Sequence, residues 1–387
     1  MVWENAPPPA TALGRYRQLS PTAGVHVSPL QLGAMSIGDQ WTPFGMGSMD
    51  KESSFKLLDA YFDKGGNFID TANFYQDESS EKFIGEWAEK RGIRDQLFLA
   101  TKYTVNWKPR DKTVPQKVFY SGNSLKSMRI SLNESLKKLR TDYIDLFYVH
   151  VWDWSTGIEE IMQGLHNFVT QGKILYLGIS DTPAWIVTKA NQYARDHALT
   201  PFTVYQGAWN VLDRSFEREI IPMARHEGMA LAPFNVLATG KLRSDSEEEA
   251  RLKSGENGRA VLNQDWKRND TEKAMARALE KVAKEVGAKS TTTIAIAYVL
   301  HKAPYVFPVI GGRRIEHLEQ NIQALEVSLT DEQIKFIESQ TEFKPEFPYS
   351  MIGTGDSLSQ FLIWGGVADR VANPAPIRPA PQEADKS

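Results

Sequence analysis

The chain has 387 residues, of which 41% are hydrophobic and 24% are charged, so it is long enough for two ordinary domains or one large α/β barrel. Its 45 basic and 48 acidic residues give a net charge of −3, which leaves no electrostatic footprint for nucleic acid or an anionic membrane. Cysteine is absent, which excludes disulfides, thiol nucleophiles and metal sites held by cysteine.

The sequence shows neither a signal peptide nor a membrane span. The N-terminus lacks the basic and apolar regions of a signal peptide, and no segment approaches the ~18 apolar residues that span a bilayer. We therefore expect a cytoplasmic protein with no membrane partner. Residues 1–15, which include a short proline run, and residues 373–387, which are rich in Pro, Ala and charge, are predicted to be flexible tails.

Between these tails, short β-rich runs alternate with longer segments of helical period. A small hairpin is expected near residues 17–27, and strands are then expected at 30–35, 67–70, 97–102, 144–150, 174–180, 203–206, 229–234 and 306–312. The helices that follow these strands are expected from about 51 to 64, and then at 80–91, 124–139, 158–171, from 184, 216–226, 272–287 with 292–302, and 315–325.

Eight strands, each followed by helix, predict an α/β fold of the (β/α)8 TIM barrel type, with a short N-terminal hairpin and a C-terminal extension. The alternative is a doubly wound open sheet, but no G-x-G-x-x-G motif follows the first strand. We expect the barrel to cover residues 16–340 and the extension, residues 341–372, to lie over the barrel mouth. An active site is expected in the loops that follow the strands.

Four ionisable side chains stand at or just after the ends of three consecutive predicted strands: Asp70, Tyr75, Lys102 and His150. A carbonyl group accepts hydride more readily if an acid protonates its oxygen, and a phenol does this best when its pKa of about 10 is lowered. Lys102 would stabilise the Tyr75 phenolate and Asp70 would hold Lys102, while His150 would orient the carbonyl. Singly, each residue is explained as well by a turn, solvent contact or packing, but together they indicate a catalytic tetrad.

The motifs DTANFY, TK at 101–102, SLKKLRTDYIDLFYVH and GIS followed by Asp181 resemble the aldo-keto reductase family over roughly residues 30–325. The resemblance implies an NADPH-dependent carbonyl reductase on a (β/α)8 barrel, with the four residues above as its tetrad. The DYIDL run that leads to His150, QGAWN and FPYSMIG further resemble a fungal branch with aryl-alcohol dehydrogenases and norsolorinic acid reductases. This implies hydride transfer between NADP(H) and an aromatic aldehyde, aryl alcohol or polyketide ketone in fungal secondary metabolism, of the mycotoxin type.

The segment GGRRIEHLEQN, residues 311–321, places two glycines where the eighth strand opens a helix, and free N–H groups there form an anion site. Arg313 and Arg314 stand where cations are disfavoured unless a bound 2′-phosphate offsets them, although both can simply be solvated. Two arginines without an acid favour NADP over NAD. In the family this stretch binds the adenosine end, so the resemblance assigns Gly312, Arg313, Arg314, His317, Gln320 and Asn321 to the cofactor.

For the nicotinamide end, the resemblance matches Ser180, Asp181 and Gln206 with carboxamide partners and places Trp209 near the stacking aromatic. Many family members carry Asn where this chain has Asp181, and a carboxylate there should favour the positively charged, oxidised ring. A second departure is Gln76, where glycine often follows the tyrosine, and it concerns the local turn rather than the chemistry.

The segment PFNVLATGKL after the seventh strand matches the part of the family that contacts the pyrophosphate, with the candidates Phe234, Val236, Leu237, Gly240 and Lys241. Residues 243–269, which follow, are charged and long for a barrel connection. Two explanations stay open for them, a disordered surface insertion or a belt that closes over the cofactor.

The substrate side is expected to be lined mainly by aromatic residues: Met35, Trp41, Trp152, Trp154, Phe347 and Tyr349. Such density suits a flat, apolar small-molecule substrate, an aromatic carbonyl or alcohol such as a bulky aromatic aldehyde or a polyketide ketone, better than a sugar, although aromatics also simply pack a barrel mouth. Oligomeric state is not indicated. Two other functions stay open: a regulatory subunit of the same fold that binds cofactor with little turnover, and a metal-dependent hydrolase, for which the seven histidines are too scattered.

Overall fold

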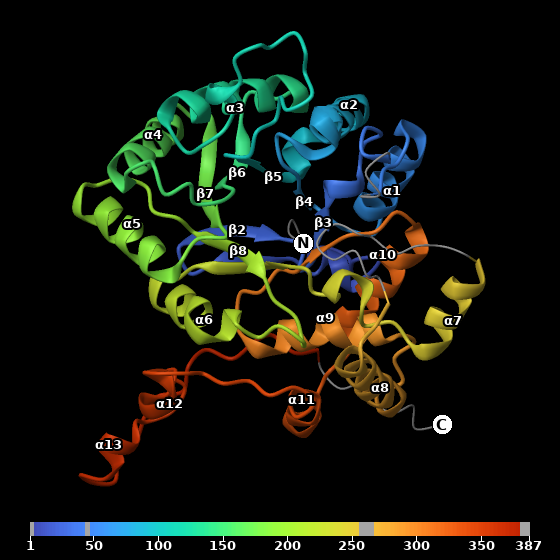
Figure 1. Cartoon of the computed structure of the whole chain (residues 1–387), viewed down its shortest axis with the longest axis vertical. Coiled ribbons are helices and arrows are strands. Elements are labelled where there is room, and N and C mark those ends of the chain that lie inside the picture. The colour runs from blue at the N-terminus through green and yellow to red at the C-terminus, as the bar shows by residue number, and fades with distance from the viewer. Residues whose placement is uncertain (1–3, 43–46, 255–266, 380–387) are drawn as a thin grey trace.

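Eight parallel strands form the centre of the computed structural model, which describes residues 4–42, 47–254 and 267–379 (Figure 1). In sheet order the strands are β10 (Val309–Ile310), β3 (Gln31–Gly33), β4 (Phe68–Asp70), β5 (Phe98–Tyr103), β6 (Ile144–Val149), β7 (Ile174–Ser180), β8 (Val204–Ala208) and β9 (Ala230–Phe234). A parallel bridge between Leu231 and Val306 joins the last strand to the segment before β10 and closes the ring. The predicted (β/α)8 barrel is confirmed.

The N-terminal hairpin of β1 (Arg17–Ser20) and β2 (Ala23–Val27) covers one end of the barrel. Leu19 of the hairpin is fully buried and belongs to a cluster with Phe68, Phe98 and Phe307, which lie at or near the starts of their strands. Because the hairpin and this cluster block the end where the strands begin, the mouth must lie where they finish.

Helices surround the strands (Figure 1), and most of them start where the sequence predicts. Asp50, for example, accepts the Ser53 N–H and so caps the first helix. The helices of the outer ring are α1 (Lys51–Asp63), α2 (Ser79–Arg91), α3 (Leu125–Leu139), α4 (Ile158–Thr170), α5 (Ala184–Asp196), α6 (Phe216–Glu227), α8 (Asp270–Glu285), α9 (Thr291–Lys302) and α10 (Ile315–Ile322). Four further helices were not predicted from the sequence: α7 (Asp245–Ser254), α11 (Asp331–Glu338), α12 (Tyr349–Ile352) and α13 (Gln360–Ile363).

Short 3-10 turns complete the connections, and two of them border the mouth, η2 (Ala34–Ser36) after β3 and η4 (Tyr75–Glu78) after β4. The others are η1 (Ala12–Gly14), η5 (Arg94–Gln96), η6 (Val118–Tyr120), η7 (Ala238–Gly240) and η8 (Gln323–Glu326).

The two tails that were predicted to be flexible contain residues with ordered contacts. Leu13 is fully buried in the core, and the Thr11 hydroxyl donates to the Lys64 carbonyl at 2.7 Å, so the expected flexible stretch 1–15 is wrong at residues 11–14. Near the other end, Arg378 pairs with Asp331 at the start of α11 at 2.9 Å. Residues 1–3 and 380–387, which were also expected to be flexible, lie outside the described residues.

The C-terminal extension does not cover the mouth. Arg218 donates to the Lys344 carbonyl at 2.9 Å, and Arg225 pairs with Asp356 at 2.7 Å, which places the extension along the outer side of α6. Figure 1 shows α12 and α13 beyond the helix ring on that side. The prediction that residues 341–372 lie over the mouth is therefore wrong.

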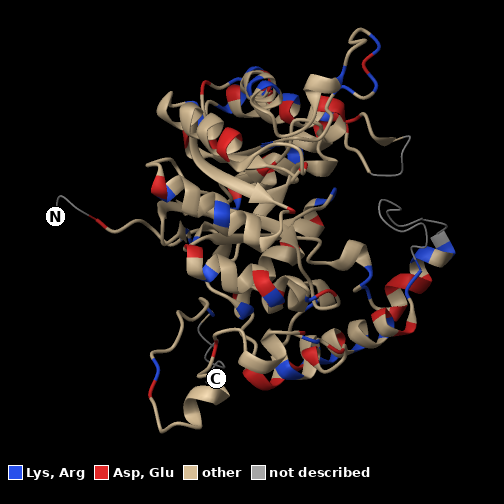
Figure 2. Cartoon of the chain, turned by 60° about the vertical axis from the view of Figure 1, so that its left-hand side comes forward, with Lys and Arg blue, Asp and Glu red and all other residues tan. Residues whose placement is uncertain are grey.

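Charges of both signs are mixed over the outer helices (Figure 2), in line with the small net charge. Figure 2 shows no large region of a single sign on the face that it presents. None of the helices that the structure describes has the length and apolar run required to cross a membrane.

Candidate active site

A buried ion pair lies beneath the barrel mouth. Asp70 ends β4 and Lys102 lies near the end of β5, and their side chains are 2% and 0% exposed. The Lys102 ammonium donates to the Asp70 carboxylate at 2.5 Å and to the Thr71 carbonyl at 2.8 Å. Gln206, on β8 across the barrel, donates to the second Asp70 oxygen at 2.9 Å. The sequence predicted that Asp70 holds Lys102, and this contact is present.

Tyr75 and His150 lie above this pair and are only partly buried. The Lys102 ammonium is 5.3 Å from the centre of the Tyr75 ring, and the Tyr75 and His150 rings meet edge to face with centres 6.0 Å apart. The structure thus brings all four residues of the predicted tetrad together, from three consecutive strand ends. Their catalytic roles remain predictions.

The electrostatics of the site keep Tyr75 protonated. Burial raises the pKa of Tyr75, and the Asp70 and Asp181 charges raise it further. From the sequence we expected Lys102 to lower this pKa, but Asp70 lies in contact with that ammonium and offsets its charge. Burial likewise lowers the pKa of Lys102, while Asp70 opposes the change.

His150 is held neutral, because burial and the Lys102 charge bring its pKa well below the usual value. Its backbone N–H donates to the Tyr103 carbonyl at 3.1 Å, and its Nδ1 is buried without a hydrogen-bond partner among the described residues. A neutral imidazole can donate a hydrogen bond to a carbonyl oxygen from its protonated nitrogen.

The predicted carboxamide partners lie at one edge of the tetrad. Ser180, at the end of β7, is 1% exposed, and its hydroxyl has no hydrogen-bond partner within the described chain. Asp181 follows it with a φ of 43°, a strained value for a residue other than glycine, and its N–H donates to the Gln206 carbonyl at 3.1 Å. An unpaired buried hydroxyl is costly, so this edge fits an amide-bearing ligand.

Asp181 is solvent-exposed by its surface area, yet incomplete hydration at the mouth raises its pKa to about 6, and only the Lys102 charge opposes the shift. The exposed area and the raised pKa agree if the carboxylate reaches water on one side only. The Asp181 carboxylate is therefore charged at neutral pH, and it becomes protonated as the pH falls through about 6.

Trp209 is not placed to stack on a nicotinamide. It is fully buried, its ring lies on that of Phe216 with centres 5.4 Å apart, and its indole N–H donates to Glu217. The ring therefore faces α6, which corrects its assignment to the cofactor. Phe234 is only partly buried at the end of β9 and stays the aromatic candidate on this side.

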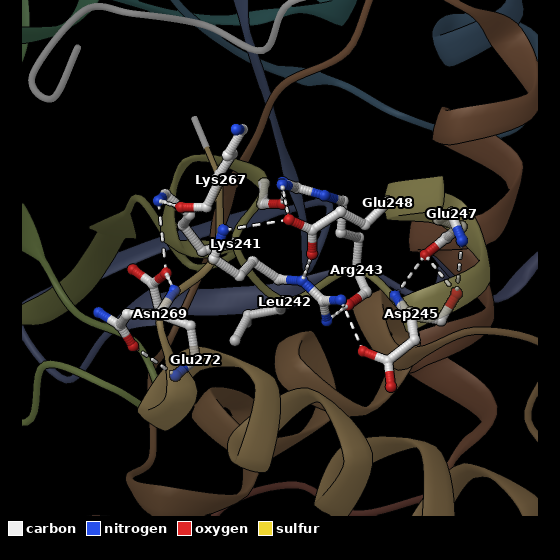
Figure 3. Close-up of polar contacts among 12 residues, drawn as sticks. Lys241, Leu242, Arg243, Asp245, Glu247, Glu248, Lys267, Asn269 and Glu272 are labelled. Carbon is white, nitrogen blue, oxygen red and sulfur yellow. Dashed lines mark hydrogen bonds and ion pairs between the residues drawn. The ribbon is translucent and has the colours of Figure 1, made fainter. Parts of the chain in front are cut away.

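The predicted pyrophosphate segment runs through η7 and is tied to the start of α8 (Figure 3). Lys241 is 8% exposed, and its ammonium donates to the Lys267 carbonyl and contacts Glu272 at 3.3 Å. Val236 is buried, whereas Leu237 and Gly240 are partly buried. Contact of these residues with a pyrophosphate remains a prediction.

The two described ends of the segment 243–269 are joined by ion pairs (Figure 3). Arg268 is 5% exposed and pairs with Glu248 and, at 2.7 Å, with Asp245, while Arg243 contacts Glu248 at 3.4 Å. These contacts, and the helix α7, show that the described ends are structured, so a wholly disordered insertion is excluded. Residues 255–266 lie outside the described residues, and the belt function stays a prediction.

The predicted adenosine site is the exposed start of α10. Arg313 and Arg314 precede the helix and are exposed, and Arg314, in the N-cap position, makes no side-chain capping bond. His317 is exposed as well, and partial loss of hydration together with the Arg314 charge lowers its pKa. Exposed cations beside uncapped N–H groups fit a bound phosphate. Of the remaining candidates, Gly312 is partly buried, Gln320 is exposed and Asn321 is 4% exposed.

The aromatic side of the mouth is smaller than predicted. Trp41 is 4% exposed, with its ring edge-on to Tyr75 at 6.2 Å, and Met35 is partly buried in the same connection. Trp152 is partly buried against the core, whereas Trp154 is 68% exposed.

Phe347 and Tyr349 do not belong to the mouth. Phe347 is 78% exposed, and the Tyr349 hydroxyl donates to Glu219 of α6 at 3.1 Å. The extension that carries them lies along α6, which corrects their place in the substrate site.

One structural feature beside the tetrad was not predicted from the sequence. Gln76 and Asp77 connect the tetrad to the loop that follows β3, through bonds to Trp41. The only signal in the sequence was the departure at Gln76 from the usual glycine. In the described part of the chain, no group of three or more His, Cys, Asp or Glu residues is placed to hold a metal ion.

The fold and the site define a class of protein: a barrel in which a phenol, backed by a buried lysine–aspartate pair, lies beside a neutral imidazole. Residues 29–342 match the model of the aldo/keto reductase family. Since this match spans most of the chain, the protein belongs to the aldo/keto reductase family, as the motifs predict.

Relatives that match most of the chain support the assignment to this family. The chain is 58% identical over 381 residues to an aryl-alcohol dehydrogenase [NADP(+)] from Phanerodontia chrysosporium, covering 98% of this chain and 99% of the relative. It is 51% identical over 348 residues to the aldo-keto reductase ausK of Emericella nidulans, covering 90% and 87%. It is 49% identical over 354 residues to norsolorinic acid reductase A of Aspergillus parasiticus, covering 91% and 87%.

Proposed function

We propose that this protein is an NADPH-dependent carbonyl reductase and alcohol dehydrogenase that acts on aromatic aldehydes, aryl alcohols or polyketide ketones. The observation that carries the proposal is the buried Lys102–Asp70 pair directly below Tyr75 and His150. The names of the similar proteins support the cofactor and the substrate class, since they include an NADP(+)-dependent aryl-alcohol dehydrogenase and a norsolorinic acid reductase. A role in fungal secondary metabolism and a cytoplasmic location are parts of the proposal that rest on sequence.

The residues of the site support proton donation to a carbonyl oxygen. Tyr75 is neutral and can donate its phenolic proton as negative charge develops on that oxygen. The nearby Lys102 ammonium then stabilises the phenolate that is left, and Asp70 keeps this ammonium in place. His150, neutral and partly exposed, can orient the carbonyl through a ring N–H.

NADPH, when bound, supplies the hydride. The unpaired Ser180 hydroxyl and the Asp181 carboxylate fit its carboxamide end, and the exposed Arg313 and Arg314 at the start of α10 fit its 2′-phosphate. These residues would position the cofactor, and the tetrad would supply the proton and orient the carbonyl.

The first test is NADPH oxidation with 3,4-dimethoxybenzaldehyde in the wild type and in Tyr75→Phe. Removal of the general acid should lower kcat by about 10²–10⁴-fold, while the NADPH dissociation constant changes little. Tyr16→Phe, at a half-exposed tyrosine far along the chain from the tetrad, is the matched control and should keep full activity.

The other candidate, a regulatory subunit that binds cofactor with little turnover, makes the opposite prediction. A wild-type protein that binds NADPH but oxidises it with none of a panel of aromatic aldehydes would support that alternative and contradict the reductase. The intact geometry of the four tetrad residues favours the enzyme.

A further inference from the structure

Gln76, the residue after the proposed acid, belongs to η4, and its side chain reaches the loop that follows β3. Its side chain is 0% exposed. Its amide oxygen accepts a hydrogen bond from the backbone N–H of Trp41 at 2.9 Å. Its amide nitrogen donates to the Met35 carbonyl at 2.9 Å and to the Gly47 carbonyl at 2.8 Å. One buried side chain therefore satisfies three backbone groups of the same loop, which makes it a structural part of that loop.

The backbone at this point is strained. Gln76, Asp77 and Glu78 have φ values of 52°, 46° and 79°, in the left-handed region, which residues other than glycine adopt only at a cost in free energy. A Cβ on Gly38, whose φ is 124°, would lie 2.5 Å from the Gln76 Cβ. The loop and the glutamine thus fit each other closely, and the contacts of the glutamine hold the strained backbone.

Asp77 extends these contacts to the indole. Its Oδ1 accepts the Trp41 indole N–H at 3.0 Å, and Arg110, from the connection after β5, binds the same carboxylate through two bonds of 2.7 Å. Trp41 is therefore held at its backbone by Gln76 and at its ring by Asp77. Its ring lies edge-on to that of Tyr75, with 6.2 Å between centres and an angle of 74°.

We propose that Gln76 and Asp77 form a clasp of two positioning residues that fixes the Trp41 indole beside the Tyr75 phenol, and that this fixed indole makes the site selective for planar aromatic carbonyl compounds. The proposal deepens the proposed function and rests on it. Because the indole is already fixed, it can pack against a flat aromatic substrate with little further loss of side-chain entropy. A short aliphatic aldehyde offers little surface to this contact, so its binding depends less on the indole.

The main test is Gln76→Gly, which removes the three bonds and also relieves the strained φ, so that the fold should survive. We expect the KM for 3,4-dimethoxybenzaldehyde to rise about tenfold, because the indole is no longer held in place, and the KM for butanal to change less than about threefold. The kcat and the NADPH dissociation constant should stay within about threefold. An equal rise in KM for both aldehydes would contradict the clasp.

The indole bond is tested separately with Asp77. Asp77→Ala should raise the KM for the aromatic aldehyde, and Asp77→Asn, which keeps an oxygen acceptor for the indole N–H, should restore most of the loss. If the effect passes through the indole, the Asp77→Ala and Trp41→Phe double variant should be no worse than the worse single variant. Additive losses would show that Asp77 acts by another route.

Hydrogen exchange gives a readout that does not need turnover. The amides of residues 35–41 should exchange faster in Gln76→Gly than in the wild type, because the Trp41 N–H loses its acceptor. Gln40→Gly is the matched control, since Gln40 is an exposed glutamine of the same loop whose amide donates to its neighbour Asp39. Unchanged exchange in Gln76→Gly would contradict the clasp, whereas a wild type that binds NADPH without oxidising it would contradict the proposed function.

Discussion

At the scale of single residues, the site separates charge from proton donation. Asp70 and Lys102 are buried as a charged pair, whereas Tyr75 and His150 above them are neutral and reach the mouth. A neutral phenol is the form that can donate a proton, and the ammonium below it is placed to stabilise the phenolate only after donation. The raised pKa of Tyr75 therefore agrees with a role as an acid, although its direction is opposite to the one expected from sequence.

Removal of one partner of the buried pair should cost stability as well as activity. Lys102→Met leaves the buried Asp70 carboxyl without its main partner, and we expect the free energy of unfolding to fall by roughly 3–5 kcal/mol. Urea unfolding measures this loss. The Asp70→Asn and Lys102→Met double variant should recover most of it while remaining inactive, and a loss below about 1 kcal/mol in the single variant would show that the pair does not carry stability.

Asp181 should make cofactor preference depend on pH. Its carboxylate, with a pKa raised to about 6, is charged at pH 8 and attracts the positive ring of NADP⁺ more than the neutral ring of NADPH. As the pH falls through 6 the group becomes neutral, so the dissociation constant of NADP⁺ should rise relative to that of NADPH. Titration with NADP⁺ and with NADPH between pH 5 and 8 measures the ratio of the two dissociation constants. Both forms carry the 2′-phosphate, so its ionisation affects both constants alike and cancels from the ratio.

The control for this ratio is Asp181→Asn, which keeps the shape of the side chain without its charge. At pH 8 this variant should weaken NADP⁺ binding relative to NADPH, and its ratio should no longer change with pH. Equal effects on the two dissociation constants would remove the electrostatic explanation.

At the scale of the elements, the site depends on close packing between the helices that follow β4 and β5. Gly85 of α2 lies against the end of α3, where an added Cβ would be 2.2 Å from the Lys138 carbonyl oxygen and 2.6 Å from the Leu139 carbonyl carbon. Backbone atoms cannot move aside as a flexible side chain can. The connection that carries Tyr75 leads directly into α2, so this helix contact helps to position the acid.

Gly85→Ala should therefore destabilise the protein by about 1–3 kcal/mol, the cost of overpacking. Gly164→Ala in α4 is the matched helical control, because its Cβ would meet only the flexible ends of Leu125 and Met128, the nearest at 2.9 Å. There the better helix propensity of alanine, up to about 1 kcal/mol, should offset most of the contact. Thermal unfolding compares the two variants, and equal losses would contradict the role of the close backbone approach.

At the scale of the whole molecule, the C-terminal extension is peripheral to the barrel. It follows the outside of α6 and carries large exposed apolar side chains, among them Phe361 at 51%, Trp364 at 74% and Val367 at 105% exposure. A chain that ends at Lys344 should keep kcat and KM for the aromatic aldehyde within about threefold, because these residues do not line the mouth. It should also aggregate less, since exposed apolar surface promotes association.

Steady-state kinetics and light scattering on the shortened chain give both results. A large rise in KM would restore the original expectation that the extension covers the mouth. Loss of folding, in contrast, would show that the contacts removed with the extension, such as Tyr349 with Glu219 and Arg225 with Asp356, contribute to the stability of the barrel.

The sequence by itself determined the eight βα units and the four tetrad positions, because strand and helix periodicity are local and the ends of parallel strands meet at one face. It also indicated the family. It could not place Trp209, whose ring turns to Phe216, or the extension, whose position depends on contacts with α6. Nor could it give the sign of the Tyr75 pKa shift, which depends on how closely Asp70 offsets Lys102.

The tertiary structure alone decided how the loops meet around the acid. The three bonds of the Gln76 amide join residues up to 41 positions apart, and the Asp77 carboxylate joins Trp41 to Arg110. Such contacts have no period and no spacing rule, since they arise only when separate strand ends converge on one mouth. The physical reason is that a local pattern fixes which face a side chain occupies, whereas its partner across the barrel is set by the closed ring.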